Sequence, residues 1–277
     1  MTHRTTLLHV EAGPETRLVG VEAGLQTRLD LPGDVHVWRF ATDRPPDELD
    51  QLHALMSDVE RRRAARFRFD GDRSRFIARR GLLRVVLARY GECDPARITL
   101  ELNAFGKPTL AGGDSRLQFN ASHSDGVALV AVTVNRAVGI DIERHRADVD
   151  CLGVAASFFS PDEVETLRRA DTPTRRSMFF TLWSCKEAWV KARGLGLSFP
   201  LDRCRVRVGE GEPRLLEDPG QPGEHARWSL TSLDVGPDFS AALVAAAGQG
   251  EAMRSPHRSE RSSRRSPASP ACGMSSS

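Results

Sequence analysis

The sequence predicts an α+β protein made of two similar subdomains that meet near residue 136. Helical and strand patterns are mixed along the chain, and the order of elements in 34–136 recurs in 137–247. The recurrence is one of order, without a residue-level repeat. Residues 1–33 contain several glycines and are expected to form an irregular extension. The serine- and arginine-rich residues 248–277 lack bulky apolar side chains and are expected to form a disordered tail.

Helix-start signals define the first subdomain. Pro46 suits the first turn of a helix, where its missing N–H is not needed. Ser57 and Glu60 form a capping-box pattern that opens a second, arginine-rich helix. The expected elements are a strand at 35–40, helices from 46, over 58–66 and over 72–90, and strands at 98–102, 117–120 and 127–134.

The second subdomain carries the same kinds of signal. Ser160 precedes Pro161 and lies three residues before Glu163, which is again a capping pattern. A longer helix is expected to end at Gly194, because glycine is the common residue just after a helix. The expected elements are a strand at 138–142, helices to about 170 and over 172–193, and strands at 204–208, 228–233 and 241–246.

Composition excludes several classes of protein. The 277 residues include 39 Lys plus Arg and 37 Asp plus Glu, so the net charge of +2 is not that of a strongly basic nucleic-acid binder. The apolar runs are far shorter than the roughly 20 residues that span a bilayer. The first ten residues lack a secretory pattern, and the five cysteines have neither disulfide nor zinc spacing. A cytoplasmic protein without a membrane or nucleic-acid partner is therefore expected.

Two carboxylates on one strand are the first candidate site. In Gly-Ile-Asp-Ile-Glu, Asp141 and Glu143 share a strand face because side chains alternate. Paired carboxylates repel unless a cation joins them, and oxygen ligands of this kind suit Mg²⁺. The alternative is an exposed strand face with two solvated acids.

The rare lysines mark further candidates, since Lys107, Lys186 and Lys191 are the chain's three lysines. Glu187 and Lys191 lie one helical turn apart on one face. They could be a metal ligand or base and a phosphate contact, or a surface ion pair worth about 0.3–0.5 kcal/mol. Lys107 lies between Gly and Pro in a predicted turn. In Phe-Asn-Ala-Ser-His-Ser, His123 stands between two serines at a strand end, where it could bind an anion or be an ordinary turn residue.

These motifs together resemble the 4′-phosphopantetheinyl transferases, specifically the single-chain Sfp type. The resemblance covers roughly 35–246 and follows the family's order. An arginine-rich helix precedes a long helix, and these are followed by Gly-Lys-Pro, Phe-Asn-x-Ser-His-Ser, Gly-Ile-Asp-Ile-Glu and Trp-Ser-Cys-Lys-Glu-Ala-Trp-Val-Lys-Ala-Arg-Gly-Leu-Gly-Leu. It implies two pseudo-symmetric α+β subdomains with the active site in the cleft between them. It also implies transfer of the phosphopantetheine arm of coenzyme A to a serine of an acyl or peptidyl carrier protein, which releases adenosine 3′,5′-bisphosphate.

The resemblance implies roles for individual residues. It places Mg²⁺ between Asp141, Glu143 and Glu187, with Asp141, Glu187 and Lys191 in the catalytic step. Glu187 is the expected base for the carrier serine, directly or through a metal-bound water. Lys191 is expected to stabilise the α-phosphate or to protonate the departing nucleotide. The coenzyme A contacts are expected to include these three residues and Arg63, Arg75, Lys107, Ser122, His123 and Lys186.

The resemblance also locates finer subsites and one departure. Arg63 and His123 are expected at the 3′-phosphate and Lys107 near the adenine and ribose. Glu60 stands where a second basic residue is expected. The carrier is expected to dock near 144–159 on a monomeric enzyme. Two alternatives stay open: a non-catalytic coenzyme A- or carrier-binding protein of the same fold, and a nucleic-acid binder that uses the arginine-rich tail and helix.

Overall fold

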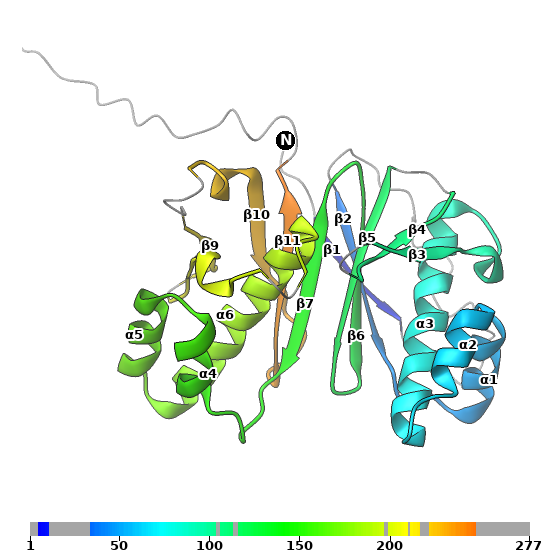
Figure 1. The fold of residues 1–277 in the computed structure, drawn as a ribbon, viewed down its shortest axis with the longest axis horizontal. Coiled ribbons are helices and arrows are strands. Elements are labelled where there is room, and N and C mark those ends of the chain that lie inside the picture. Colours follow the sequence, from blue (N-terminus) through cyan, green and yellow to red (C-terminus); the bar gives the residue numbers. More distant parts are fainter. Residues whose placement is uncertain are drawn as a thin grey trace, which may run out of the picture.

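The chain forms four layers, with two β-sheets packed face to face between two groups of helices (Figure 1). This arrangement comes from a computed structural model. The structure describes residues 5–10, 34–103, 106–112, 116–196, 199–209, 211–216 and 222–247. The predicted α+β class, with helices and strands in both halves, is confirmed. The expected tail at 248–277 lies outside the described residues.

The N-terminal half contains a four-stranded sheet of order β1-β2-β6-β5, in which β1 is parallel to β2 and the other pairs are antiparallel. The longest helix of this half lies against the outer face of the sheet, the two shorter helices contact that helix, and a small hairpin lies beside them (Figure 1). The elements are β1 (Thr5–Val10), β2 (Val35–Ala41), α1 (Pro46–Ala54), α2 (Asp58–Ala64), α3 (Asp70–Gly91), the 3-10 turn Pro95–Arg97, β3 (Leu100–Leu102), β4 (Pro108–Leu110), β5 (Leu117–Ser124) and β6 (Val127–Val134).

The C-terminal half contains a three-stranded antiparallel sheet of order β10-β11-β7. The longest helix of this half lies against the outer face of the sheet, and the two shorter helices pack on it (Figure 1). The elements are β7 (Val138–Arg144), α4 (Cys151–Phe158), α5 (Pro161–Arg169), α6 (Thr172–Arg193), the 3-10 turns Leu201–Arg203 and His225–Arg227, β8 (Val206–Arg207), β9 (Arg214–Leu215), β10 (Trp228–Ser232) and β11 (Phe239–Ala246).

Several of these elements differ from the sequence prediction, including β1, β4, α4 and β9. Strand β1 lies inside 1–33, where an irregular extension is expected. Its hydrogen bonds go to β2, a long-range pairing that local composition does not reveal. Helix α4 is not among the expected elements. Its N-cap is Asp150, whose carboxylate accepts a hydrogen bond from the Gly153 N–H at 3.0 Å.

Strand alternation determines which side chains face the core. On β7, Ile140 and Ile142 are fully buried between the two sheets. Asp141 and Glu143 therefore project from the opposite face, toward α6. The sequence argument that both acids share one face is consistent with this arrangement.

Gly139 allows α6 to pack directly on β7. A Cβ atom at this position would lie 2.0 Å from the carbonyl oxygen of Ala188 and 2.3 Å from the amide nitrogen of Ala192. Both of these atoms are backbone atoms of α6, so no side-chain rotation could relieve the overlap. The glycine thus sets the distance between β7 and α6, the two elements that carry the candidate acids.

None of the described helices combines the length and the apolar character needed to cross a membrane.

Candidate active site

A cavity of about 250 Å³ lies between the two halves of the chain and receives side chains from both. The N-terminal half contributes the turn at Lys107 and residues of β5, and the C-terminal half contributes the end of α6. The lining residues are Gly106, Lys107, Pro108, Asn120, Ala121, Glu187, Val190, Lys191, Gly194 and Gly196.

An ion pair between β7 and α6 lies at this cavity. The Lys191 Nζ is 2.5 Å from the Oδ1 of Asp141, which is almost completely buried. The Ser122 hydroxyl of β5 donates to the same Oδ1 at 2.8 Å and accepts from Lys191 Nζ at 3.1 Å. Three elements from both halves therefore converge on a single carboxylate oxygen.

The other oxygen of Asp141 suits a cation. Asp141 Oδ2 is buried and has no hydrogen-bond partner among the described residues. A buried carboxylate oxygen without a donor is costly unless something binds it. The described residues do not contain a preformed cluster of three acidic, histidine or cysteine side chains at metal-binding spacing. The donor set nevertheless fits Mg²⁺, which prefers one or two carboxylates and completes its shell with water and substrate phosphates.

The two further acids share one electrostatic environment. Burial raises the pKa of Glu143 to about 7, and the nearby charges of Asp141 and Glu187 add to the rise. Burial also raises the pKa of Glu187, with Lys191 opposing and Asp141 adding to the effect. The charge of Asp141 thus raises the pKa of both glutamates, and a cation among the three carboxylates would favour the charged forms.

Lys107 joins the two halves at the same cavity. Its Nζ donates to the carbonyl of Val138 at 3.0 Å and to that of Lys191 at 3.0 Å. Burial lowers the pKa of Lys107 to about 8. The ammonium therefore ties the β3–β4 hairpin to the start of β7 and to the end of α6.

Comparison with known proteins places this site in a family. Residues 137–244 match the model of the 4′-phosphopantetheinyl transferase superfamily, and residues 43–135 match the model of the N-terminal part of 4′-phosphopantetheinyl transferases. The 4′-phosphopantetheinyl transferase HetI of Nostoc sp. is 38% identical over 79% of this chain and 90% of its own length. The chain belongs to the 4′-phosphopantetheinyl transferase superfamily.

Other relatives agree with this assignment. A putative 4′-phosphopantetheinyl transferase of Synechocystis sp. is 31% identical over 71% of this chain and 78% of its own. The 4′-phosphopantetheinyl transferase Sfp of Bacillus subtilis is 30% identical over 76% of this chain and 92% of its own. The resemblance to transferases of the Sfp type is thus confirmed, and so is the prediction of an enzyme.

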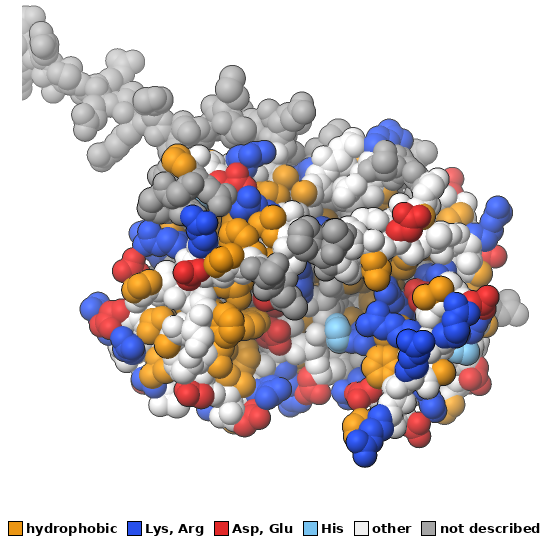
Figure 2. Space-filling view, viewed as in Figure 1, with side chains coloured by type: hydrophobic (Ala, Val, Ile, Leu, Met, Phe, Trp, Pro, Cys, Tyr) orange, Lys and Arg blue, Asp and Glu red, His pale blue; other side chains and the backbone are white. Residues whose placement is uncertain are grey.

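A second polar region of this transferase is an arginine cluster on α2 and α3. Figure 2 shows basic side chains gathered over these helices. The guanidinium groups of Arg63 and Arg80 lie 5.3 and 5.9 Å from the ring centre of Phe76. Burial lowers the pKa of Arg79 to about 10, and the charges of Arg80, Arg63 and Arg75 add to this effect. Partly buried, mutually repelling guanidinium groups are suited to binding an anion.

Arg63 is one of the predicted coenzyme A contacts, whereas Arg79 and Arg80 are not among the residues predicted from the sequence. Arg79 and Arg80 lie on the expected helix 72–90, where the spacing of the many arginines alone does not separate cluster members from solvated surface residues. A signal was nevertheless present, because Arg79 and Arg80 lie one turn after Phe76, the aromatic residue on which the cluster is built.

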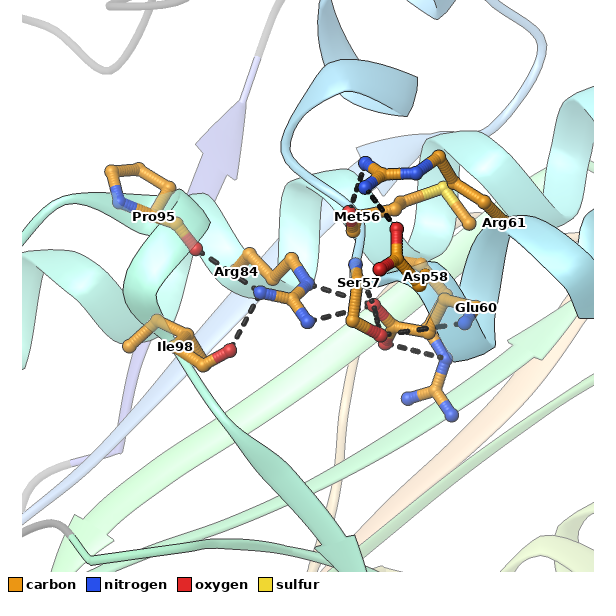
Figure 3. A network of polar contacts seen from close by, with 9 residues as sticks. Met56, Ser57, Asp58, Glu60, Arg61, Arg84, Pro95 and Ile98 are labelled. Carbon is orange, nitrogen blue, oxygen red and sulfur yellow. Dashed lines mark hydrogen bonds and ion pairs between the residues drawn. The ribbon is translucent and has the colours of Figure 1, made fainter.

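Glu60, the departure from the family pattern, has a structural role (Figure 3). It completes the capping box with Ser57, and its Oε2 accepts hydrogen bonds from Arg84 at 2.7 and 2.9 Å. Arg84 is buried and also donates to the carbonyl of Ile98 at 2.6 Å. Arg80 Nε lies 3.6 Å from Glu60 Oε1. The acid therefore holds α2 against α3 and anchors one arginine of the cluster.

The structure does not bring Lys186 into the cavity. Its side chain is fully buried, and its Nζ lies 2.8 Å from Glu163 Oε2 and donates to the carbonyls of Leu201 and Cys204. Successive residues on a helix are about 100° apart, so Lys186 points away from the direction of Glu187. A direct contact of Lys186 with coenzyme A does not fit this position.

Arg75 and His123 are not among the residues that line the described cavity. The Arg75 guanidinium donates to both carboxylate oxygens of Asp43, at 2.6 and 3.2 Å, and is 3.8 Å from Asp125. Its charge is therefore partly compensated by these acids, and it borders the arginine cluster. His123 is exposed, and strand alternation places it on the face of β5 opposite to Ser122. That face also carries Phe119, which packs in the core shared with α3.

Proposed function

We propose that this transferase moves the 4′-phosphopantetheine arm of coenzyme A to a serine of an acyl or peptidyl carrier protein in a Mg²⁺-dependent reaction. The observation that carries the proposal is the meeting of Asp141, Glu187 and Lys191 at a cavity between the two halves. Membership of the superfamily supports the transfer itself. Because both halves of one chain supply the site, we expect a monomer to be active.

The proposed step is a substitution at the β-phosphorus of coenzyme A. The carrier serine oxygen forms a bond to this phosphorus and loses its proton. The bond from the phosphorus to the oxygen that bridges to the α-phosphate breaks, and adenosine 3′,5′-bisphosphate leaves with the bond's electron pair. Such reactions depend on positioning and on charge stabilisation more than on covalent help from the protein.

Asp141, Glu143 and Glu187 are the residues that would hold Mg²⁺. The bound ion would neutralise charge on the pyrophosphate and fix its orientation. Asp141 would bind through its unpartnered Oδ2, while its Oδ1 keeps the contacts with Ser122 and Lys191. Lys191 can then face the α-phosphate side of the substrate without leaving its position between strand β5 and strand β7.

Glu187 is the proposed acceptor of the serine proton, either directly or through a water molecule. Its raised pKa makes the carboxylate a better proton acceptor than an exposed glutamate. Metal binding lowers this basicity, which favours the route through water. Lys191 would stabilise the charge that develops on the leaving phosphate.

The arginine cluster is the proposed site of the coenzyme A 3′-phosphate. Arg63, Arg79 and Arg80 supply the charge, and His123 lies on the sheet face that turns toward α3. Lys107 lines the cavity, where it would lie near the adenine and ribose. Its ammonium already binds two carbonyl groups. We therefore infer that Lys107 has two roles, one in holding the walls of this subsite together and one in contacting the nucleotide.

The carrier protein is proposed to dock on the C-terminal half near 144–159. Phe158 is 46% exposed and its ring packs edge-on against Trp183 with 5.8 Å between centres. Phe159 is buried in the core, so it supports this surface instead of forming it. An exposed aromatic residue of this kind suits a transient protein partner.

Replacement of Glu187 tests this proposal. Glu187→Gln keeps the size of the side chain but removes its charge and its capacity to accept a proton. We expect transfer of a fluorescent coenzyme A derivative to an apo-carrier to fall at least 100-fold, because general base catalysis contributes roughly 10²–10⁴-fold. The matched control is Glu165→Gln on exposed α5, which should leave the rate unchanged. Near-normal turnover of Glu187→Gln would remove this residue from the mechanism.

A further inference from the structure

Strands β5 and β7 lie side by side although they belong to different sheets (Figure 1). Side chains of β5, instead of a backbone ladder, make the hydrogen bonds between them. Asn120 accepts from the Ile140 N–H at 2.9 Å, and Ser122 donates to Asp141 at 2.8 Å. Asn120 and Ser122, two residues apart on one face of β5, thus each bind a residue of β7. Ser124 is the next residue on that face.

Ser124 contacts two consecutive residues at the end of β7. Its Oγ accepts a hydrogen bond from the Arg144 N–H at 3.0 Å. Because this bond occupies a lone pair of the oxygen, the hydroxyl proton is free to point elsewhere. It is directed to the Glu143 Oε2, at 3.3 Å.

The neighbouring residue reinforces this contact. Asp125 forms an ion pair with the Arg144 guanidinium. Asp125 has a positive φ of 38° and lies in the turn between β5 and β6. Two adjacent residues of one half, Ser124 and Asp125, therefore hold two adjacent residues of the other half, Glu143 and Arg144.

Glu143 needs such a partner more than the other two acids do. Asp141 is short and is held by both Ser122 and Lys191, and Glu187 is held by the rigid packing of α6. Glu143 has a longer side chain at the end of a strand and faces the negative charge of Asp141. In the described part of the chain, the hydrogen bond to its carboxylate comes from Ser124.

We propose that Ser124 is a positioning residue for Glu143, which it holds toward Asp141 so that both carboxylates can bind one metal ion. This inference rests on the proposed function, since it assigns Glu143 to the metal. Partners that hydrogen-bond a ligating carboxylate orient it, and their loss typically weakens metal binding tenfold or more. Ser124 itself touches neither the substrate nor the ion.

The test is direct binding of Mn²⁺, used as a spectroscopic substitute for Mg²⁺. The free ion is counted by electron paramagnetic resonance in the presence of coenzyme A. Ser124→Ala should weaken Mn²⁺ binding roughly tenfold, and Ser124→Thr, which keeps the hydroxyl, should restore most of it. The control is Ser229→Ala on β10, which removes a strand hydroxyl that donates to the Ala245 carbonyl and should change nothing. In steady-state transfer, Ser124→Ala should raise the Mg²⁺ concentration for half-maximal rate and leave the KM for the carrier unchanged.

A second variant covers the possibility that Ser124→Ala folds poorly. Asp125→Asn tolerates the positive φ but loses the ion pair with Arg144, and it should weaken Mn²⁺ binding by a smaller factor. Binding within twofold of the parent in both Ser124→Ala and Asp125→Asn, with a parent that binds Mn²⁺ and transfers phosphopantetheine, would overturn this inference alone. A parent that neither binds Mn²⁺ nor transfers the arm would overturn the proposed function as well.

Discussion

Replacement of Gly139 by alanine should separate the catalytic elements without changing any side chain of the site. The new Cβ would lie 2.0 Å from the Ala188 carbonyl oxygen, whereas an ordinary contact is at least 3.4 Å. Strand β7 and helix α6 must therefore move apart by about 1.4 Å, because both partners are backbone. The 2.5 Å contact between Lys191 and Asp141 spans the same two elements and would lengthen by a similar amount.

The consequences for rate and stability can be estimated. A misplacement of about 1 Å can cost roughly 100-fold in rate, and overpacking a core typically costs about 1–3 kcal/mol of unfolding free energy. We expect kcat/KM for transfer to an apo-carrier to fall about 100-fold in Gly139→Ala. Urea denaturation monitored by circular dichroism should show a stability loss within the range above.

Two glycine variants separate these effects. Gly81→Ala places a Cβ 2.6 Å from Leu52 in the α1–α3 packing, so it should lower stability and leave the rate per folded molecule unchanged. Gly71→Ala meets nothing within 4 Å and should be neutral in both assays. If Gly139→Ala retained more than a third of the parent kcat/KM, the close approach of β7 and α6 would not position the site.

Three further predictions concern single groups of the site and its support. Lys191→Arg keeps the charge but replaces a compact ammonium that is held by Asp141 and Ser122. The transfer rate should therefore fall at least tenfold with little change in melting temperature. An equal rate would refute a specific role for the ammonium. Glu143 has a pKa of about 7 and must lose its proton to bind a metal. Mn²⁺ affinity measured by calorimetry should therefore be about tenfold weaker at pH 6 than at pH 8. A constant affinity would contradict the assignment of Glu143 as a metal ligand. Lys186→Met leaves Glu163 buried without its cation and should cost about 3–5 kcal/mol in urea denaturation, whereas a loss below about 1 kcal/mol would show that the pair is not a structural anchor.

The arginine cluster yields a prediction that depends on the substrate. Arg79→Gln should raise the KM for coenzyme A about tenfold or more, because hydrogen bonds to charged groups are worth about 1.5–3 kcal/mol. The same variant should leave the KM for 3′-dephospho-coenzyme A unchanged, since that substrate lacks the phosphate. Equal effects on both substrates would remove Arg79 from the 3′-phosphate site.

Local periodicity explains why part of this site is readable from the sequence. Strand alternation alone places Asp141 and Glu143 on one face, and helical spacing places Glu187 and Lys191 on one side of α6. The motif order then identifies the family. These patterns involve residues that are close in the sequence, so they do not depend on how the two halves pack against each other.

Side-chain partners that depend on tertiary packing could not be predicted from the sequence. Helix α6 is buried on several sides, so periodicity cannot say that Lys186 faces Glu163 while Glu187 faces the cavity. The pairing of Glu60 with Arg84 joins residues of two helices and explains an acid where the family pattern suggests a base. The side-chain bridges from β5 to β7 also depend on contacts between separate sheets.

The most direct test of the central claim is the intact mass of an apo-carrier protein incubated with this chain and coenzyme A. With Mg²⁺ present, the account predicts that the carrier gains the mass of one phosphopantetheine on its serine. The gain should disappear when the metal is chelated, and also in Asp141→Ala, which removes the buried oxygen proposed to bind the ion. An unchanged carrier mass with the parent chain, or full conversion after chelation, would contradict the account.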